Sequence, residues 1–425
     1  MSDLNYQSRI TSHQSPIMKK ILLTAYAVNP YKGSEDGTAW NMITQIAKHH
    51  KVIAITRENN QEAIDKYLKE NELEGSENLE FAYFDLPYWM RFWKKGGQGA
   101  LLYFYMWQVG IVSFISSNKL EFDIAHNLNF HSDWTPTFLW RLGKPVVWGP
   151  VGHHHKIPDQ YLAPVYSKKE RFMDTLKWWT KLFFWNLDPF LGIAKRKAYK
   201  ILAINSSVVD MMRLKADKAV IIPAVGSEPM NQDFTKSDTQ FNVLSIGRFV
   251  PLKGFDITVK AFAQFYKTLS DTDKANAKLI LVGKGPYQKA LQKMVEAEGV
   301  TEGVQFINWI ERAKLKSIYE SAHLFFFPSH EGAGMVVPEA LSFRVPILCF
   351  DNYGPGEFIN EECGFKIPYT EYEKSINEFA KHLQLIYQDK TLQKKLQQGA
   401  INRYQEQFDW NIKGNQISAI YEEIS

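Results

Sequence analysis

Short apolar segments that alternate with helical segments constrain this chain more than any other feature. The first unit is a strand-like ILLTAYAV, a loop NPYKGSEDG, a helix-like TAWNMITQIAKHH and a second strand-like KVIAIT. Parallel strands need a crossover connection of about this length, usually a helix. Further apolar segments follow in the same half, LEFAYFDL, FDIAHNL, KPVVWGP and YKILAIN. The first half therefore predicts a doubly wound parallel sheet.

The second half repeats the pattern after an interruption. Residues 223–240, PAVGSEPMNQDFTKSDTQ, are rich in Pro, Gly, Ser and Asp, which is typical of a linker. FNVLSIG, AKLILVG, VQFINW, HLFFFPS and VPILCFD then alternate with helical segments. A chain of 425 residues also exceeds the size that one core usually supports. We therefore predict two doubly wound, Rossmann-like α/β domains, residues 18–222 and 241–407, that face each other across a ligand-binding cleft.

Composition excludes several classes of protein. A hydrophobic content of 45% with 23% charged residues is globular. The 50 Lys and Arg against 46 Asp and Glu give a net charge of +4, too small to indicate a nucleic-acid partner. With two cysteines and no CxxC pattern, the chain is expected in a reducing cytoplasm. The short apolar run after Met18 predicts a first strand rather than a signal peptide.

Basic residues follow the first strand of the second half. Arg248 comes after FNVLSIG, and Lys253 with Gly254 opens the next helix. An arginine fork, a lysine charge and a helix N-terminus together favour phosphate oxygens, although two solvated surface cations would give the same pattern. A dinucleotide fingerprint is disfavoured, because Gln288 occupies the third glycine position after GKGP.

The stretch HEGAGMVVPEAL places two glutamates eight positions apart, Glu331 and Glu339. Gly332 and Gly334 allow a sharp turn after the strand HLFFFPS, and Pro338 suits the first position of a helix. Glu331 is then expected in the loop and Glu339 in the first helical turn. Carboxylates accept hydrogen bonds from sugar hydroxyls, and helix N-termini bind phosphate. The stretch predicts a site for a ligand that is part sugar and part diphosphate.

These segments resemble a known family. PSHEGAGMVVPEAL is similar to the E-x7-E signature of retaining glycosyltransferases of the GT-B fold, glycosyltransferase family 4. GRFVPLKG, LILVGKGP, GSEDGTAW and FDIAHNLNFHSDWTP resemble further blocks of that family, so the likeness spans most of the chain from Met18. It implies a hexosyltransferase-type enzyme that uses a UDP- or GDP-linked sugar, without a metal or another cofactor. It also implies that residues 408–425 form a helix that crosses back to the first domain.

The resemblance implies roles for matching residues. Arg248 and Lys253 would hold the donor diphosphate, Glu331 the donor sugar and Glu339 the ribose. The residues expected to contact the donor are Gly33, Gly37, Arg248, Lys253, Gly285, Glu331, Gly334, Met335, Val336 and Glu339. The expected catalytic residues are His131, Glu331, Arg248 and Lys253. The family places a functional histidine after a strand of the first domain; His126 and His131 are both candidates, and we favour His131, with His126 ending the strand.

Three other interpretations of these residues differ in the activity they predict. The run His153-His154-His155 could ligate a metal, but no cysteine or carboxylate lies at ligand spacing beside it, so we favour polar residues that line the cleft. The two glutamates could serve a retaining glycoside hydrolase, which needs its carboxyls roughly 5 Å apart and has no use for phosphate-binding cations. The chain could also bind a nucleotide-sugar without catalysis.

Two clusters of aromatic and basic residues indicate the kind of acceptor. LPYWMRFWKK holds Tyr88, Trp89, Phe92 and Trp93 beside Arg91, Lys94 and Lys95, and KWWTKLFFWNLDPF holds Lys177, Trp178, Trp179, Lys181, Phe184 and Trp185. This mixture suits a membrane–water interface, although the same rings could fill a core. The run between the clusters is interrupted by Gln108 and Gly110 and predicts a core helix rather than a membrane span. We expect a lipid-linked glycan acceptor, met at the inner face of the plasma membrane during exopolysaccharide, capsule or O-antigen assembly.

Overall fold

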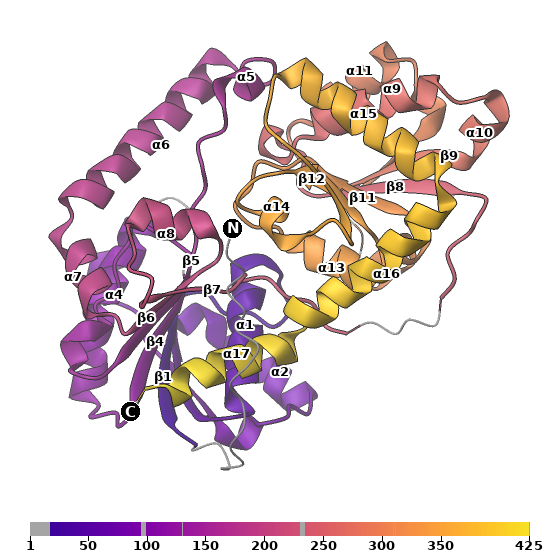
Figure 1. Ribbon diagram of the computed structural model, residues 1–425. Helices are drawn as coiled ribbons and strands as arrows, with labels where there is room; N and C mark the ends of the chain where they lie inside the picture. The colour runs from indigo at the N-terminus through magenta and orange to yellow at the C-terminus, as the bar shows by residue number, and fades with distance from the viewer. Residues whose placement is uncertain are drawn as a thin grey trace.

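The computed structural model describes residues 18–94, 99–129, 131–229, 234–308, 310 and 312–424. Two α/β domains lie side by side, each built on a parallel sheet (Figure 1). This confirms the predicted fold class. Of the site and cluster residues singled out from the sequence, Lys95 lies outside the described residues.

The N-terminal sheet has, within the described residues, seven parallel strands in the order β3-β2-β1-β4-β5-β6-β7. They are β1 (Lys20–Ala25), β2 (Lys51–Thr56), β3 (Leu79–Tyr83), β4 (Ile124–Asn129), β5 (Val146–Val151), β6 (Lys200–Ala203) and β7 (Ala219–Ile221). Every residue of β5 is buried. Strands covered on both faces read as continuous apolar runs, which is why the sequence pattern identified them.

Helices cover both faces of this sheet. They are α1 (Ser34–Ala47), α2 (Gln61–Glu70), α3 (Tyr88–Arg91), α4 (Ala100–Ser117), α5 (Asp159–Leu162), α6 (Lys168–Leu187), α7 (Pro189–Lys197) and α8 (Ser206–Met212), with short 3-10 turns at Glu58–Asn60, Ser76–Asn78 and Leu139–Leu142. Helix α1 contributes to the core on one face and α4 to the core on the other.

The C-terminal sheet has six parallel strands among the described residues, in the order β10-β9-β8-β11-β12-β13. They are β8 (Phe241–Ile246), β9 (Ala277–Val282), β10 (Val304–Ile307), β11 (Leu324–Phe327), β12 (Ile347–Phe350) and β13 (Gly364–Ile367). The helices are α9 (Phe255–Lys267), α10 (Asp271–Asn276), α11 (Gln288–Ala297), α12 (Arg312–Ser321), α13 (Val336–Ser342), α14 (Pro355–Phe358), α15 (Tyr372–Gln388) and α16 (Lys390–Gln407), with 3-10 turns at Pro251–Lys253 and Thr301–Gly303.

The strand order reverses at one point in each sheet. The reversal lies between β1 and β4 in the first sheet and between β8 and β11 in the second. Open α/β sheets bind ligands beyond the carboxyl ends of the strands at such points. His131 follows β4, Arg248 follows β8 and Glu331 follows β11. The topology therefore directs the search for a site to these three loops.

The chain passes between the domains twice, and the two passages lie together. After the second passage, α17 (Trp410–Glu422) packs against α1 of the first domain (Figure 1). Ser227 of the first passage pairs with Asp409 of the second, and the Ser227 N–H donates to the Phe408 carbonyl at 2.9 Å. The Tyr404 hydroxyl adds a hydrogen bond to the Ser227 carbonyl at 3.0 Å. The two passages thus form a single connection.

Among the described residues, α4 is the one helix that is long and apolar enough to cross a membrane by length and composition. It packs on the sheet, where Tyr103, Phe104 and Trp107 are buried. This is the core position that the sequence predicted for it.

The two aromatic clusters each divide into inward and outward rings. Trp93 turns inward, where its Nε1 donates to the Met90 carbonyl at 2.8 Å. Trp178 and Trp185 pack on the His153 ring. By contrast, Trp89 and Trp179 are 70% and 66% exposed. The sequence could not separate these two sets.

Candidate functional site

Two loops of the C-terminal domain meet through a glycine. Gly254, between the 3-10 turn Pro251–Lys253 and α9, has a φ of +68°, and a Cβ there would lie 2.1 Å from the Pro328 carbonyl oxygen. Only a residue without a side chain fits so close to that backbone. The loop after β8 is thereby held against the loop after β11, which carries Glu331.

Lys253 and Glu331 form an ion pair where these loops meet. Their Nζ and Oε2 atoms are 2.6 Å apart, and both side chains are largely covered. The ammonium also lies 5.2 Å from the centre of the Phe327 ring. Arg248 is exposed on the loop after β8. An ammonium has three donors, so Lys253 can hold Glu331 and still bind an anion.

Gly285 has a packing reason to be glycine. A Cβ at Gly285 would lie 2.3 Å from the Phe249 carbonyl oxygen. Gly283 is held in the same way, because its φ is +150° and a Cβ there would lie 1.9 Å from the Gly247 carbonyl oxygen. The loops after β8 and β9 are therefore pressed together. This contact shapes the loop that carries Arg248.

Helix α13 begins earlier than the sequence predicted. Its first residue is Val336, with Met335 as the N-cap, so Pro338 is the third helical residue and not the first. Proline is tolerated there because the first N–H groups of a helix have no intrahelical partner. Glu339 accepts a hydrogen bond from the Tyr319 hydroxyl at 3.0 Å, and Gly334 packs on the Phe327 ring. The amides of Gly334, Met335 and Val336 lie at the start of this helix.

The N-terminal domain brings Glu35 to His131. Glu35, in the first turn of α1, accepts a hydrogen bond from the His131 backbone N–H at 3.2 Å, and its Oε1 lies 3.7 Å from His131 Nδ1. Burial raises the pKa of Glu35 to about 7, aided by the charge of Asp36. Burial also lowers the pKa of His131 to about 4, with a contribution from His154. His131 is therefore a neutral imidazole near pH 7, and its buried Nε2 has no hydrogen-bond partner among the described residues.

The contacts of His126 give it a structural role. It lies inside β4 and does not end the strand, which corrects the sequence prediction. Its Nδ1 shares a 2.5 Å hydrogen bond with the Tyr421 hydroxyl of α17, and its Nε2 is 2.6 Å from the Gly149 carbonyl. Burial lowers its pKa to about 4. Both nitrogens are engaged, so His126 joins α17 to the sheet.

The side chains of the three consecutive histidines contact three different residues. His153 Nδ1 is 2.6 Å from Asp133 Oδ2, and both side chains are buried. His154 Nδ1 accepts the Gly332 backbone N–H of the other domain at 3.1 Å. The His155 ring stacks on Tyr353, also of the other domain. In the described part of the chain, no three His, Cys, Asp or Glu side chains are grouped so that they could hold a metal ion.

Gly332 hydrogen-bonds the N-terminal domain through both its carbonyl and its N–H group. Its carbonyl accepts a hydrogen bond from Asn205 Nδ2 at 2.9 Å, while its N–H is bound by His154. A Cβ on Gly332 would lie 2.2 Å from the His153 carbonyl oxygen. Nearby, Glu357 accepts hydrogen bonds from the backbone and side chain of Ser206 at 2.9 and 2.5 Å. The residue before Gly332 is Glu331, so these contacts set the position of that carboxylate.

Several of these residues were missed from the sequence. Glu35, Asp133, Asn205 and Glu357 act through contacts between distant parts of the chain. Glu35 alone left a signal, because it stands between Gly33 and Gly37 in GSEDG. Gly37 needs to be glycine, since a Cβ would lie 2.3 Å from the Lys32 carbonyl oxygen, whereas a Cβ at Gly33 would meet none of the described residues.

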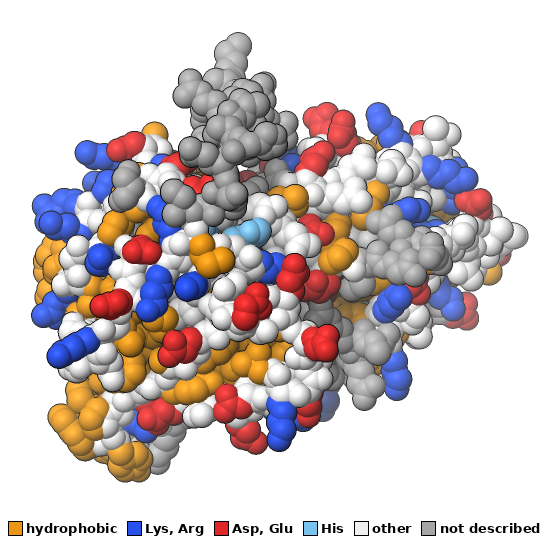
Figure 2. All heavy atoms as spheres, turned by 90° about the horizontal axis from the view of Figure 1, so that it is seen from below, with side chains coloured by type: hydrophobic (Ala, Val, Ile, Leu, Met, Phe, Trp, Pro, Cys, Tyr) orange, Lys and Arg blue, Asp and Glu red, His pale blue; other side chains and the backbone are white. Residues whose placement is uncertain are grey.

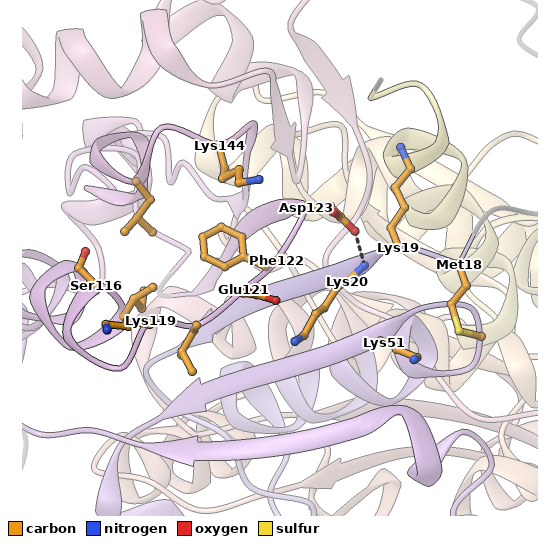
Figure 3. A pocket seen from close by; sticks show the side chains of 13 residues that line it. Met18, Lys19, Lys20, Lys51, Ser116, Lys119, Glu121, Phe122, Asp123 and Lys144 are labelled. Carbon is orange, nitrogen blue, oxygen red and sulfur yellow. Dashed lines mark hydrogen bonds between the residues drawn. The ribbon is translucent and has the colours of Figure 1, made fainter.

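A separate cavity of about 830 Å³ lies at the opposite edge of the N-terminal sheet (Figure 3). It is lined by Lys20 and Lys51 at the amino ends of β1 and β2, with Lys119, Phe122 and Lys144 around it. Ligands of open α/β sheets bind at the carboxyl ends of the strands. We therefore place the candidate active site at the meeting of the two domains, around Lys253, Glu331 and His131.

Comparison with known proteins agrees with this architecture. The protein resembles the crystal structure of Anabaena Alr3699/HepE in complex with UDP, with a TM-score of 0.62 and 18% identity over 96% of this chain and 100% of that one. At this identity the likeness shows the fold. Residues 227–403 match the family model described as glycosyl transferases group 1. The fold is thus that of the GT-B glycosyltransferases, and the family model matches residues of the C-terminal half of the chain.

Curated relatives are also glycosyltransferases. The chain is 23% identical over 270 residues to the alpha-D-kanosaminyltransferase of Streptomyces kanamyceticus, across 58% of this chain and 67% of that enzyme. It is 31% identical over 125 residues to a GDP-mannose-dependent alpha-(1-6)-phosphatidylinositol monomannoside mannosyltransferase of Mycolicibacterium smegmatis. That second match spans 28% of this chain and 31% of the relative, less than a third of its length.

Proposed function

We propose that the protein is a retaining glycosyltransferase that moves a sugar from a nucleoside-diphosphate sugar to a glycan acceptor without a metal ion. The observation that carries this proposal is the Lys253–Glu331 pair. Its charged atoms are 2.6 Å apart, on the loops that follow β8 and β11, where the strand order of the C-terminal sheet reverses. It joins a cation suited to phosphate with a carboxylate suited to sugar hydroxyls.

In this proposal the donor lies along the loops after β8 and β11. Lys253 and Arg248 neutralise the diphosphate as it leaves, which is stabilisation of charge that grows in the transition state. Glu331 accepts hydrogen bonds from the donor sugar, and Glu339 from the ribose. UDP and GDP are both supported as the nucleotide, since the Anabaena structure contains UDP and the mycobacterial relative is named GDP-mannose-dependent.

The first domain supplies the acceptor side. His131 is neutral near pH 7, because burial lowers its pKa to about 4, so its Nε2 can accept a hydrogen bond from a sugar hydroxyl. In a retaining transfer the departing phosphate lies on the face that the acceptor attacks and can take the acceptor's proton. Such a reaction needs positioning and charge stabilisation more than a strong base.

We further propose a lipid-linked glycan as the acceptor, used in surface polysaccharide assembly at the inner face of the plasma membrane. Two observations support this choice. The mycobacterial relative is named for a phosphatidylinositol-linked acceptor. Large aromatic side chains, including Tyr88 and Trp89, are exposed on the acceptor-side domain.

The test is a transfer assay with a panel of UDP- and GDP-sugars and lipid-linked acceptors, followed by NMR of the product. We expect one donor to be consumed only with an acceptor present, and the new bond to keep the donor's anomeric configuration. An inverted product would reject retention. Donor cleavage that needs no acceptor would favour a hydrolase, and binding without turnover would favour a sugar-binding protein.

Metal independence has its own test. Because Arg248 and Lys253 supply positive charge, EDTA should leave the transfer rate unchanged. Loss of activity that a divalent cation restores would reject this part of the proposal and direct attention to the Asp133–His153 pair.

A further inference from the structure

Helix α6 carries its apolar side outward. Five large side chains, Phe172, Leu176, Trp179, Phe183 and Leu187, are between 49% and 67% exposed. Their spacing of three or four residues puts them on one face of the helix. None of the twenty residues of α6 is buried. A surface helix normally turns such a row toward the core.

The opposite side of α6 holds it on the domain through a few rings. Trp178 and Trp185 lie against His153, with ring centres 6.0 and 5.4 Å away, and Phe184 lies 4.9 Å from Trp134. The charged Asp174 is on this inner side and is half-buried. Since packing already occupies the inner side, the outer row is a separate apolar surface that needs a partner.

The charges around the row identify that partner. Lys168 and Lys169 are exposed on the row's side of the helix. The helix's acids, Glu170 and Asp174, project from its other side, and Glu170 is engaged in the capping box with Ser167. Arg196 and Lys197 are exposed in the last turn of the adjoining α7. Figure 1 draws α6 along the upper left of the N-terminal domain; Figure 2 views the molecule from below and shows hydrophobic and basic side chains interspersed on the left of that domain.

We propose that the outer face of α6, defined by Phe172, Leu176, Trp179, Phe183 and Leu187, docks the protein on an anionic lipid bilayer. The row extends about 22 Å along the helix at 1.5 Å per residue. Aromatic side chains settle at the headgroup level of a bilayer, and flanking lysines are attracted to anionic lipids. The helix therefore lies in the plane of the membrane surface, with its apolar row between the headgroups.

This inference deepens the proposed function, on which its choice of a membrane as partner rests. The inner side of α6 contacts His153, and the next residue, His154, binds Gly332 beside Glu331. Docking through α6 would therefore bring the candidate active site close to the bilayer surface, where a lipid-linked acceptor is presented.

The test is co-sedimentation of the full-length protein with phosphatidylglycerol and phosphatidylcholine vesicles. We expect binding to the anionic vesicles that weakens at high salt. The triple variant Leu176→Ser/Trp179→Ser/Phe183→Ser should lower the partition coefficient by roughly a hundredfold or more, because three large apolar side chains are lost from the lipid phase. Lys168→Glu/Lys169→Glu should reduce binding to phosphatidylglycerol and weaken its salt dependence, with Arg196 and Lys197 retained.

Matched controls are Leu68→Ser and Leu385→Ser, which remove exposed leucines from α2 and from α15 of the other domain. They should bind vesicles like the wild type. Unchanged binding of the triple variant, or no binding of the wild type at low salt, would overturn the proposal. A dimer that the triple variant dissociates would assign the face to a second copy of the chain instead.

Vesicle binding and transfer can fail independently. The outer row lies outside the candidate active site, so the triple variant should keep wild-type turnover with a water-soluble acceptor. A protein that binds vesicles through α6 but transfers no sugar would contradict the proposed function and leave the docking surface standing.

Discussion

The Lys253–Glu331 pair shows how single residues determine what this site can bind. Without a ligand, the ammonium and the carboxylate satisfy each other at 2.6 Å. Phosphate oxygens and sugar hydroxyls offer each partner a further contact without separating the pair. In the proposed function, the two side chains are thus held in position for the donor, which would lower the ordering cost of binding.

The first prediction concerns the cations. Arg248→Ala/Lys253→Ala should lower kcat/KM, because the leaving diphosphate loses its counter-charges. The corresponding loss of transition-state stabilisation should be roughly 2–4 kcal/mol. Steady-state kinetics with the donor found in the panel would measure this. Wild-type turnover in the double variant would contradict the phosphate role.

Glu331→Gln should reduce turnover more than it weakens binding of the bare nucleoside diphosphate.

The second prediction concerns Glu35 and pH. Its pKa is about 7 in the folded protein and near the ordinary glutamate value when unfolded, so the folded state binds more protons between about pH 4.5 and 7. Stability from this group is therefore present at low pH and is lost as pH rises through that window. Glu35→Gln should remove the loss, about 1–2 kcal/mol after solvent screening.

Urea unfolding between pH 5 and 8 measures the effect of Glu35. Glu62→Gln is the matched control, since Glu62 is an exposed glutamate in the first turn of another helix, α2. An identical pH dependence in the wild type and Glu35→Gln would show that Glu35 does not titrate in this range.

At the level of elements, continuous apolar runs were enough to predict the central strands of both sheets. The edge strands β7 and β13 were missed, because AVI and GFKI are short, and β13 mixes polar with apolar residues. The glycine loops and the run of three histidines were indicated by their residue types, but the contacts of His154 and Asn205 with Gly332 were not. Their roles depend on Gly332, more than a hundred residues away, and sequence periodicity carries no information on such contacts.

The third prediction concerns the loop at Gly332. Gly332→Ala should reduce turnover strongly, since its Cβ would lie 2.2 Å from the His153 carbonyl and would push the domains apart beside Glu331. Gly192→Ala is the control, because it lies inside α7 and its Cβ would have no atom of the described residues within 4 Å. That change should leave activity intact and raise stability by about 0.5–1 kcal/mol. Equal activity in the two variants would contradict the proposed contact.

At the level of the whole molecule, α17 completes the core of the first domain. Trp410, Ile417 and Tyr421 are buried in that core beside β-strands and α1. The buried Lys413 donates to the Pro223 carbonyl at 2.6 Å, so it ties α17 to the first passage between the domains. The N-terminal domain is therefore assembled from two separate parts of the sequence.

The fourth prediction tests this assembly. Tyr421→Phe removes the hydroxyl that hydrogen-bonds His126 and leaves a buried ring nitrogen without that partner, which should cost about 1–3 kcal/mol of stability. Thermal unfolding measures the change. Tyr199→Phe is the control, because its hydroxyl bond to the Glu423 carbonyl is exposed. A Tyr421→Phe variant as stable as the control would show that the buried bond contributes little.

The split origin of the first domain matters during translation and in the construction of chimeras. The ribosome must synthesise the entire second domain before α17 emerges to pack against α1. Until then the nascent first domain exposes the apolar surface that Trp410 and Tyr421 later cover. For the same reason, a chimera designed to change donor specificity should replace residues 223–408 as one internal segment. Helix α17 should come from the same protein as the first domain.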